Sequence, residues 1–236
     1  SGGWHIADCA TRSFDLEGMH VGTVAAGRIG LAVLRRLKPF DVHLHYFDRH
    51  PLPAEVEAEV GGTRHASVEE MVPLCDVVTI NCPLHPETEN LFDEAMLGRM
   101  KRGAYLVNTA RGKIVDREAV ARALRSGQLA GYAGDVWFPQ PAPRDHPWRT
   151  MPHHVMSPHT SGTSLSALAR YAAVCQANQI VPIVEPEVLM DGAHDIARCD
   201  EVTRFVLQTV FRELFEQRVA LEGIVLKPNM VCCGKK

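Results

Sequence analysis

One segment near the start of the sequence constrains the fold more than any other. An apolar, β-branched run (residues 19–25) leads into the glycine turn AAGRIG (residues 25–30), and apolar residues then recur at helical spacing until Pro39. A strand that passes through a glycine turn directly into a helix is typical of the first half of a β-α-β unit. The segment therefore predicts a parallel sheet that is covered by helices.

The rest of the chain continues this alternation. Capping residues predict helices after Ser67 and after Asp116, the second of which ends at Gly127. A proline-rich stretch, residues 137–152, predicts a fixed loop over one end of the sheet. A helix is expected from about Thr163 to Gln176, and a long helix with an apolar face over residues 196–214. Further strands are predicted at residues 42–47, 77–80, 104–107, 131–136, 155–156, 180–184 and 223–226, which together indicate an α/β fold.

Composition argues against several classes of function. The 236 residues carry 25 Lys and Arg against 28 Asp and Glu, with no basic stripe, so we expect no nucleic-acid partner. No apolar run reaches membrane-spanning length and no signal peptide is visible, which predicts a soluble, cytoplasmic protein with no membrane partner. The seven cysteines form no CxxC pair and the histidines are scattered, so reduced thiols are expected and no metal site.

Two features of the first β-α-β unit predict a dinucleotide site. Gly27 has no side chain that would keep a pyrophosphate from the backbone, and the helix that follows offers amide donors. Asp48 ends the second strand, where its carboxylate can accept hydrogen bonds from ribose hydroxyls and repel a 2′-phosphate. NAD is thus the expected cofactor, in preference to NADP. The alternatives are a tight turn at Gly27 and a turn residue at Asp48.

Several motifs together resemble the cofactor domain of NAD-dependent formate dehydrogenases, within the D-2-hydroxyacid dehydrogenase superfamily. They are AAGRIG (25–30), NCPLHP (81–86), NTARG (108–112), GDVW (134–137), Gln140 and SPH (157–159), and the resemblance spans residues 4–162. It implies a doubly wound (Rossmann) parallel sheet. It also implies cofactor contacts by Ala25, Gly27, Arg28, Ile29, Gly30, Asp48, Pro83, His85, Thr109, Asp135, His159, Ser161 and Gly162.

Three residues carry the expected chemistry. Arg111 follows a strand, and its guanidinium can hold a small carboxylate by two charge-assisted hydrogen bonds; the alternative is a solvated surface charge. Relatives that oxidise 2-hydroxy acids pair a histidine with a carboxylate, whereas Gln140 is neutral and would orient the imidazole of His159. This resembles formate oxidation, which transfers only a hydride and needs no general base. By resemblance, Asp135 accepts from the nicotinamide carboxamide, and Cys82 lies beside the cofactor or simply packs locally.

A second resemblance begins at about Ala169. The motifs LARYA (168–172), VPIVEPE (181–187), LEG (221–223) and LKPNM (226–230) are similar to those of class I fructose-bisphosphate aldolases. The resemblance implies that Lys227 is a Schiff-base lysine with Glu185 as an acid/base group near it. Because only two of the eight barrel strands are present, we expect no aldolase activity. The segment is interpreted as part of a TIM barrel that extends or caps the Rossmann sheet.

Three parts are therefore expected: a linker helix (1–17), an NAD-binding domain (18–162) and an aldolase-like segment (163–236). The predicted reaction is hydride transfer from formate to NAD, slowed because the catalytic domain of the family is missing. A non-catalytic NAD-binding module and another D-2-hydroxyacid dehydrogenase remain as alternatives, the second opposed by Gln140. A homodimer is implied by the family alone. The two resemblances make the chain a chimera, natural or constructed.

Overall fold

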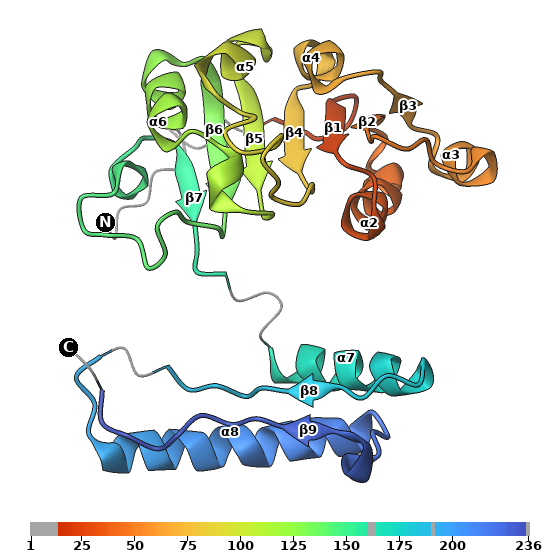
Figure 1. The fold of residues 1–236 in the computed structure, drawn as a ribbon. Helices are drawn as coiled ribbons and strands as arrows, with labels where there is room; N and C mark the ends of the chain where they lie inside the picture. The colour runs from red at the N-terminus through yellow and green to blue at the C-terminus, as the bar shows by residue number, and fades with distance from the viewer. Residues whose placement is uncertain (1–13, 160–163, 190–191, 235–236) are drawn as a thin grey trace. The chain divides into compact units, whose positions relative to one another are not determined.

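A computed structural model describes residues 14–159, 164–189 and 192–234 of the chain (Figure 1). It divides into two compact units, residues 1–159 (unit 1) and residues 160–236 (unit 2). Each unit has its own sheet and its own hydrophobic core. The units are therefore described separately.

Unit 1 is built on a seven-stranded sheet in which every pair of neighbouring strands is parallel. The strand order is β3-β2-β1-β4-β5-β6-β7, so the direction of winding reverses between β1 and β4. In open sheets of this kind, ligands bind at the carboxyl ends of the strands beside the reversal point. The predicted doubly wound α/β fold is confirmed, with strands β1 (His20–Val24), β2 (His43–Phe47), β3 (Thr63–Arg64), β4 (Val77–Ile80), β5 (Ala104–Asn108), β6 (Leu129–Gly134) and β7 (His154–Met156).

Most helices of unit 1 begin where a side chain caps the free backbone amides. Ser67 accepts from the Glu70 N–H at the start of α4, and Asp116 accepts from two amides of α6. Gly127, at φ +69°, ends α6 as predicted. The short elements α3, α5 and β3 were not predicted, since each spans too few residues to show a clear period. The helices are α2 (Arg28–Leu37), α3 (Ala54–Val60), α4 (Val68–Met71), α5 (Glu94–Arg99) and α6 (Arg117–Ser126).

The core of unit 1 lies on both faces of the sheet. Leu34 of α2 and Val60 of α3 pack with Leu44 and Tyr46 of β2 in one cluster. A larger cluster joins residues of α4, α5 and α6 to strands β4, β5 and β6, and it includes Trp148 from the proline-rich stretch. That stretch is a loop with one 3-10 turn, Pro147–Arg149. The buried indole of Trp148 anchors this loop to the core.

Unit 2 does not extend the large sheet, which corrects one of the two roles expected for it. Its two short strands pair with each other in parallel and form a separate sheet. Ala169 and Ala172 pack with Val210 and Leu214 around Val184. Its elements are α7 (Leu165–Ala177), β8 (Ile183–Val184), α8 (Ile196–Glu216) and β9 (Val225–Leu226).

The expected linker helix over residues 1–17 falls mostly outside the described residues. Its described end, residues 14–17, is loop and turn instead of helix. Gly18 follows at φ +74°, and its N–H donates to the Asp41 carbonyl (2.9 Å), so the chain turns into β1 at this point. Across the described ranges, no helix is both long and apolar enough to span a membrane.

Candidate cofactor and substrate site

The glycine turn joins β1 tightly to α2. A Cβ at Gly30 would collide with the Ala25 carbonyl oxygen, so only glycine allows the helix to lie this close to the strand. A Cβ at Gly27 would meet nothing within 4 Å, and no side chain caps the first turn of α2. The helix N-terminus therefore leaves amide donors and open space for an anion such as a pyrophosphate. Arg28 and Ile29 are the first two residues of this helix, and 65% of the Ile29 surface is exposed.

Asp48 lies at the carboxyl end of β2, the strand next to β1 on the side away from β4. Its Oδ2 accepts from the Ala26 N–H (2.8 Å) and its Oδ1 from the His50 N–H (3.0 Å), which fixes the carboxylate. A cavity of about 530 Å³ opens here. Four of the predicted cofactor residues line it, namely Ala25, Asp48, Pro83 and His85. The remaining lone pairs of the fixed carboxylate suit the hydroxyls of an adenosine ribose.

The segment that contributes Pro83 and His85 is held by a residue that the sequence analysis missed. The Thr88 hydroxyl donates to the Pro83 carbonyl (2.8 Å) and accepts from the His85 N–H (2.8 Å). The signal was the short separation of Thr88 from the motif, since a hydroxyl there can close a local turn. Cys82 also lines the cavity, but burial raises the pKa of its thiol to about 11. The thiol stays protonated, as expected for a packing residue.

Asp135 follows β6 and His159 follows β7, and the structure brings these two side chains together. The His159 Nδ1 lies 3.0 Å from the Asp135 Oδ2. Within the described residues the partner of this imidazole is the carboxylate of Asp135, and the expected role of Gln140 in orienting it stays a prediction. The contact between Asp135 and His159 has a topological reason, because β6 and β7 are neighbours whose ends meet, whereas Gln140 belongs to the loop beyond them.

The second oxygen of Asp135 provides a test of whether the site fits a nicotinamide. Asp135 is only 8% exposed, and its Oδ1 has no hydrogen-bond partner in the described part of the chain. A buried carboxylate oxygen without a donor is costly. A carboxamide N–H₂ would supply the missing donor. The residues present therefore fit both ends of the dinucleotide.

The loop that carries Arg111 is shaped by Asn108, a second residue that the sequence analysis did not single out. Asn108 is fully buried; its Nδ2 donates to the Arg111 carbonyl (3.0 Å) and its Oδ1 accepts from the Ala110 N–H (3.1 Å). Its place at the strand end inside NTARG was the available signal, since asparagine often closes such turns. Thr109 and Arg111 are exposed on this loop, and the guanidinium donates to the Ala110 carbonyl (2.6 Å).

The three predicted catalytic residues occupy three loops at the same edge of the sheet. Arg111 follows β5, Gln140 follows β6 and His159 follows β7. Gln140 lines a cavity of about 490 Å³ together with Trp137 and Arg149. The structure does not bring the three side chains into mutual contact within the described residues. Ser161 and Gly162, two predicted cofactor residues, lie outside those residues.

The predicted aldolase-type pair of unit 2 is in contact. Lys227 follows β9, and its Nζ lies 2.8 Å from Glu185 Oε1 and 3.1 Å from Glu187 Oε1. The hydrogen bond to Glu185, with that to Glu187, raises the pKa of the Lys227 amine above its ordinary value. A Schiff-base lysine needs the opposite shift, because only the neutral amine attacks a carbonyl.

Comparison with known proteins gives two family matches. The model "D-isomer specific 2-hydroxyacid dehydrogenase, NAD binding domain" matches residues 1–161. The model "Fructose-bisphosphate aldolase class-I" matches residues 148–236. Formate dehydrogenase of Pseudomonas sp. (strain 101) is 72% identical over 172 residues, which cover 73% of this chain and 43% of that protein. The chain spans about half the length of the curated relatives that it matches.

Solved structures agree with the first match. A formate dehydrogenase of Granulicella m. is 63% identical with a TM-score of 0.70, covering 76% of this chain and 49% of that one. An NAD-dependent formate dehydrogenase from Staphylococcus aureus, solved in complex with NAD, is 46% identical with a TM-score of 0.63, covering 71% and 49%. With its parallel sheet, its glycine turn and its fixed acidic residue, the chain belongs to the NAD-binding domain family of the D-isomer specific 2-hydroxyacid dehydrogenases.

Proposed function

We propose that unit 1 serves a formate dehydrogenase, in which formate gives a hydride to NAD and leaves as CO₂. The observation that carries the proposal is the set of three loops at one sheet edge that carry Arg111, Gln140 and His159, with His159 in contact with Asp135, whose other oxygen has no partner in the described residues. The 72% identity to a formate dehydrogenase supports the choice of substrate. Gln140 supports it as well, because the reaction releases no hydroxyl proton and needs no carboxylate at that position.

Different residues of the chain are proposed to bind the cofactor and the substrate. When bound, NAD supplies the hydride acceptor. Asp48 would bind the ribose, the first turn of α2 would bind the pyrophosphate, and Asp135 Oδ1 would accept a hydrogen bond from the carboxamide. Arg111 and His159 would hold the two formate oxygens and so orient formate for hydride transfer. Catalysis then rests on positioning and charge, since no proton is transferred in the step.

The test uses NAD-loaded chain and two substrates. We expect formate binding by calorimetry and NADH formation with formate, and neither with D-lactate. Arg111→Ala should weaken formate binding by about thirtyfold, which corresponds to ~2 kcal/mol for a charge-assisted pair. Arg122→Ala is the matched control, because that exposed arginine on α6 pairs with Glu94 away from the site. NADH formation with D-lactate but not formate would instead support a 2-hydroxyacid dehydrogenase, in which the Asp135–His159 pair acts as the base.

Three further points are part of the proposal. The two family matches overlap at residues 148–161. This overlap supports the interpretation of the chain as a chimera of dehydrogenase and aldolase sequence. A homodimer rests on the family resemblance, and light scattering of the purified chain tests it. A cytoplasmic location rests on the thiol-rich composition, and cell fractionation tests that.

A further inference from the structure

Trp137 joins the three loops that carry the predicted catalytic residues. A Cβ on Gly112, the residue after Arg111, would lie 2.7 Å from the Trp137 carbonyl carbon, so the two loops touch through their backbones. The Trp137 indole N–H donates to the Ser157 carbonyl (2.9 Å), two residues before His159. Gln140 follows Trp137 on the same loop. Trp137 therefore contacts the loops that carry Arg111 and His159 and lies on the loop that carries Gln140.

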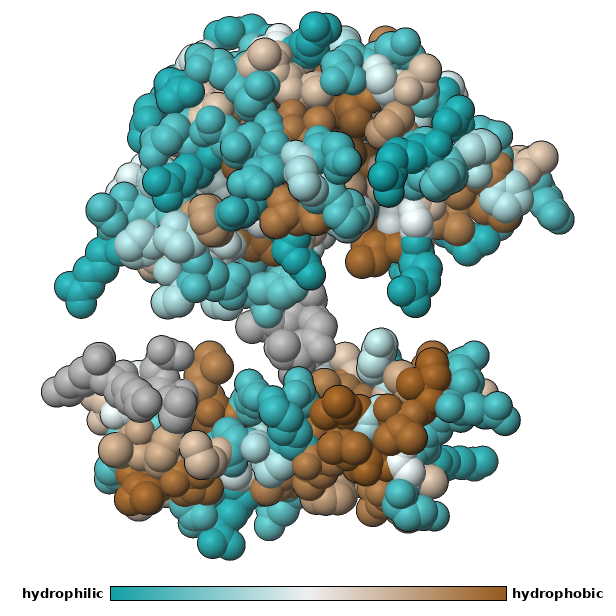
Figure 2. All heavy atoms as spheres, in the orientation of Figure 1, coloured by the Kyte–Doolittle hydropathy of each residue, from teal (hydrophilic) through white to brown (hydrophobic). Residues whose placement is uncertain are grey.

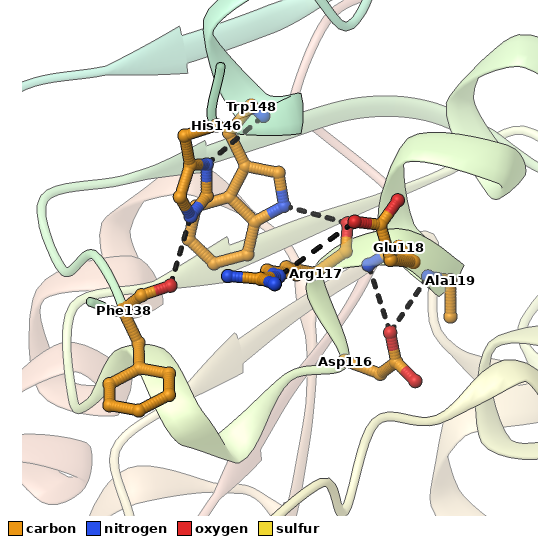
Figure 3. Close-up of polar contacts among 7 residues, drawn as sticks. All are labelled: Asp116, Arg117, Glu118, Ala119, Phe138, His146 and Trp148. Atoms are coloured by element: carbon orange, nitrogen blue, oxygen red, sulfur yellow. Dashed lines mark hydrogen bonds and ion pairs between the residues drawn. The ribbon is translucent and has the colours of Figure 1, made fainter. Parts of the chain in front are cut away.

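Trp137 is held in turn by His146, whose ring is 2% exposed. The His146 Nδ1 accepts from the backbone N–H of Trp148 (3.2 Å), so the ring hydrogen is on Nε2, which donates to the Phe138 carbonyl (3.0 Å) (Figure 3). The imidazole also meets the Trp137 ring edge-on, with 5.4 Å between centroids. Both ring nitrogens of the buried His146 are thus hydrogen-bonded to backbone groups, one to the Phe138 carbonyl and the other to the Trp148 N–H.

The other end of this arrangement is fixed to a helix. The Trp148 indole N–H donates to the carbonyl of Arg117, the first residue of α6 (3.0 Å). Asp116 caps that helix by accepting from the amides of Glu118 and Ala119, as Figure 3 shows. Hydrogen bonds and ring contacts therefore run from a capped helix through Trp148 and His146 to the loop that carries Gln140.

From this geometry we propose that His146 is a positioning residue of the substrate site. It fixes Trp137 and the Phe138 carbonyl, and through them it sets the distances among Arg111, Gln140 and His159. His146 is not among the residues proposed to bind formate or NAD. An apolar side chain of similar size would leave the Phe138 carbonyl and the Trp148 amide without their partner, which favours a rearranged loop. The proposal rests on the function proposed above for this site.

The experiment compares His146→Leu, which loses both hydrogen bonds, with His146→Gln, which keeps a donor near the place of Nε2. His43→Leu is the matched control, since His43 is an exposed histidine of unit 1 at the amino end of β2. Nuclear magnetic resonance follows the Trp137 indole N–H and the His159 ring in the full chain. Calorimetry measures NAD affinity, and then formate affinity of the NAD-loaded chain.

In His146→Leu we expect the Trp137 and His159 resonances to shift, formate affinity to fall about tenfold or more, and NAD affinity to stay within about twofold. His146→Gln should restore the resonances and bring formate affinity to within about threefold of the parent chain. A merely structural role would lower NAD and formate affinity together. Unchanged Trp137 and His159 resonances in a folded His146→Leu chain would overturn the proposal.

The readouts separate this proposal from the proposed function. If the parent chain binds NAD but no formate, the function fails. The resonances of Trp137 and His159 still decide whether His146 sets the position of the loops. If formate binds the parent chain and His146→Leu equally well, the positioning role is wrong and the function stands.

Discussion

Units 1 and 2 both place charged side chains after parallel strands, but in very different surroundings. Asp135, after β6, is nearly buried and keeps one carboxylate oxygen without a partner. Lys227, after β9, is exposed, and two carboxylates already surround its amine. The unpaired Asp135 oxygen can accept a hydrogen bond from a ligand, whereas the Lys227 amine is already paired with Glu185 and Glu187. At the end of β6 the fold excludes water and leaves one carboxylate oxygen unpaired, which is costly unless a ligand supplies a donor.

The difference follows from the size of the two sheets and of the apolar clusters that pack against them. In its described residues, unit 1 has seven strands with apolar clusters on both faces, which support the loops at the edge of the sheet. The described part of unit 2 has two strands of two residues each. Tyr171, Phe205 and Phe215 remain exposed there, and apolar side chains are widespread on the face of unit 2 in Figure 2.

The largest expected effect concerns how deeply aromatic side chains are buried in the two units. Trp148→Ala should destabilise unit 1 by about 4 kcal/mol, because the removed indole is fully buried and leaves a cavity. Phe215→Ala removes another aromatic ring in unit 2, but this ring is 81% exposed, so we expect less than ~0.5 kcal/mol. Urea unfolding measures both. Similar losses for the two variants would break the comparison.

A somewhat smaller effect is expected for cofactor choice. The Asp48 carboxylate is fixed by two backbone amides and should disfavour a 2′-phosphate by about a hundredfold, or ~2.7 kcal/mol. We expect Asp48→Ser to lose most of that preference for NAD over NADP in calorimetric titrations. Glu185→Gln, which changes a strand-end carboxylate in unit 2, should alter neither affinity. Equal NAD and NADP affinities in the parent chain would contradict the role of Asp48.

The third prediction concerns a chain of histidines that runs from β1 through β2 to the residue after β3 in unit 1. The nitrogens of His20 and His45 lie 2.8 Å apart, and those of His45 and His65 lie 2.9 Å apart. Burial, together with the nearby His65 and His20, lowers the pKa of His45 from 6.5 to about 4. Between these values the unfolded chain binds a proton that the folded chain does not. Acidification from pH 6.5 to 4 should therefore destabilise unit 1.

A shift of that size corresponds to about 3 kcal/mol, and residual hydration of the ring reduces our expectation to ~2 kcal/mol. Urea unfolding of the parent chain and of His45→Gln at several pH values measures the effect. The variant should lose most of the dependence in this window. An equally steep dependence in His45→Gln would assign it to other groups.

The smallest effect is expected at Lys227. Because Glu185 and Glu187 raise the pKa of its amine, borohydride treatment with dihydroxyacetone phosphate should leave no adduct at Lys227 by mass spectrometry. Lys227→Met should leave NAD affinity unchanged. A stoichiometric adduct that disappears in the variant would show that unit 2 does build a reactive lysine.

Local sequence was sufficient for much of unit 1. Ser67, Asp116 and Gly127 mark helix ends through contacts within a few residues, and the structure has them as predicted. The glycine turn and Asp48 were placed correctly for the same reason, since strand, turn and helix follow each other directly. The short helices α3 and α5 were not predicted, because seven and six residues are too few to show a clear helical period in the apolar positions.

The partners of the site residues could not be read from the sequence. Asp135 and His159 are 24 positions apart and meet because β6 and β7 are neighbours. Trp148 lies in a proline-rich stretch that resembles a surface loop, and only the packing of α6 shows that its indole is buried. Asn108 and Thr88 had ordinary turn composition, and their contacts became visible only with the loops in place.

By itself, the sequence determined the order of most strands and helices, the glycine turn and the family, since these depend on spacing along the chain. The tertiary structure decided that unit 2 forms its own sheet, that His159 pairs with Asp135, and that Lys227 is exposed. The physical reason is that burial and pairing depend on which distant segments meet. The free energy of a charged group is set by those neighbours and by the water they exclude, not by its position in a motif.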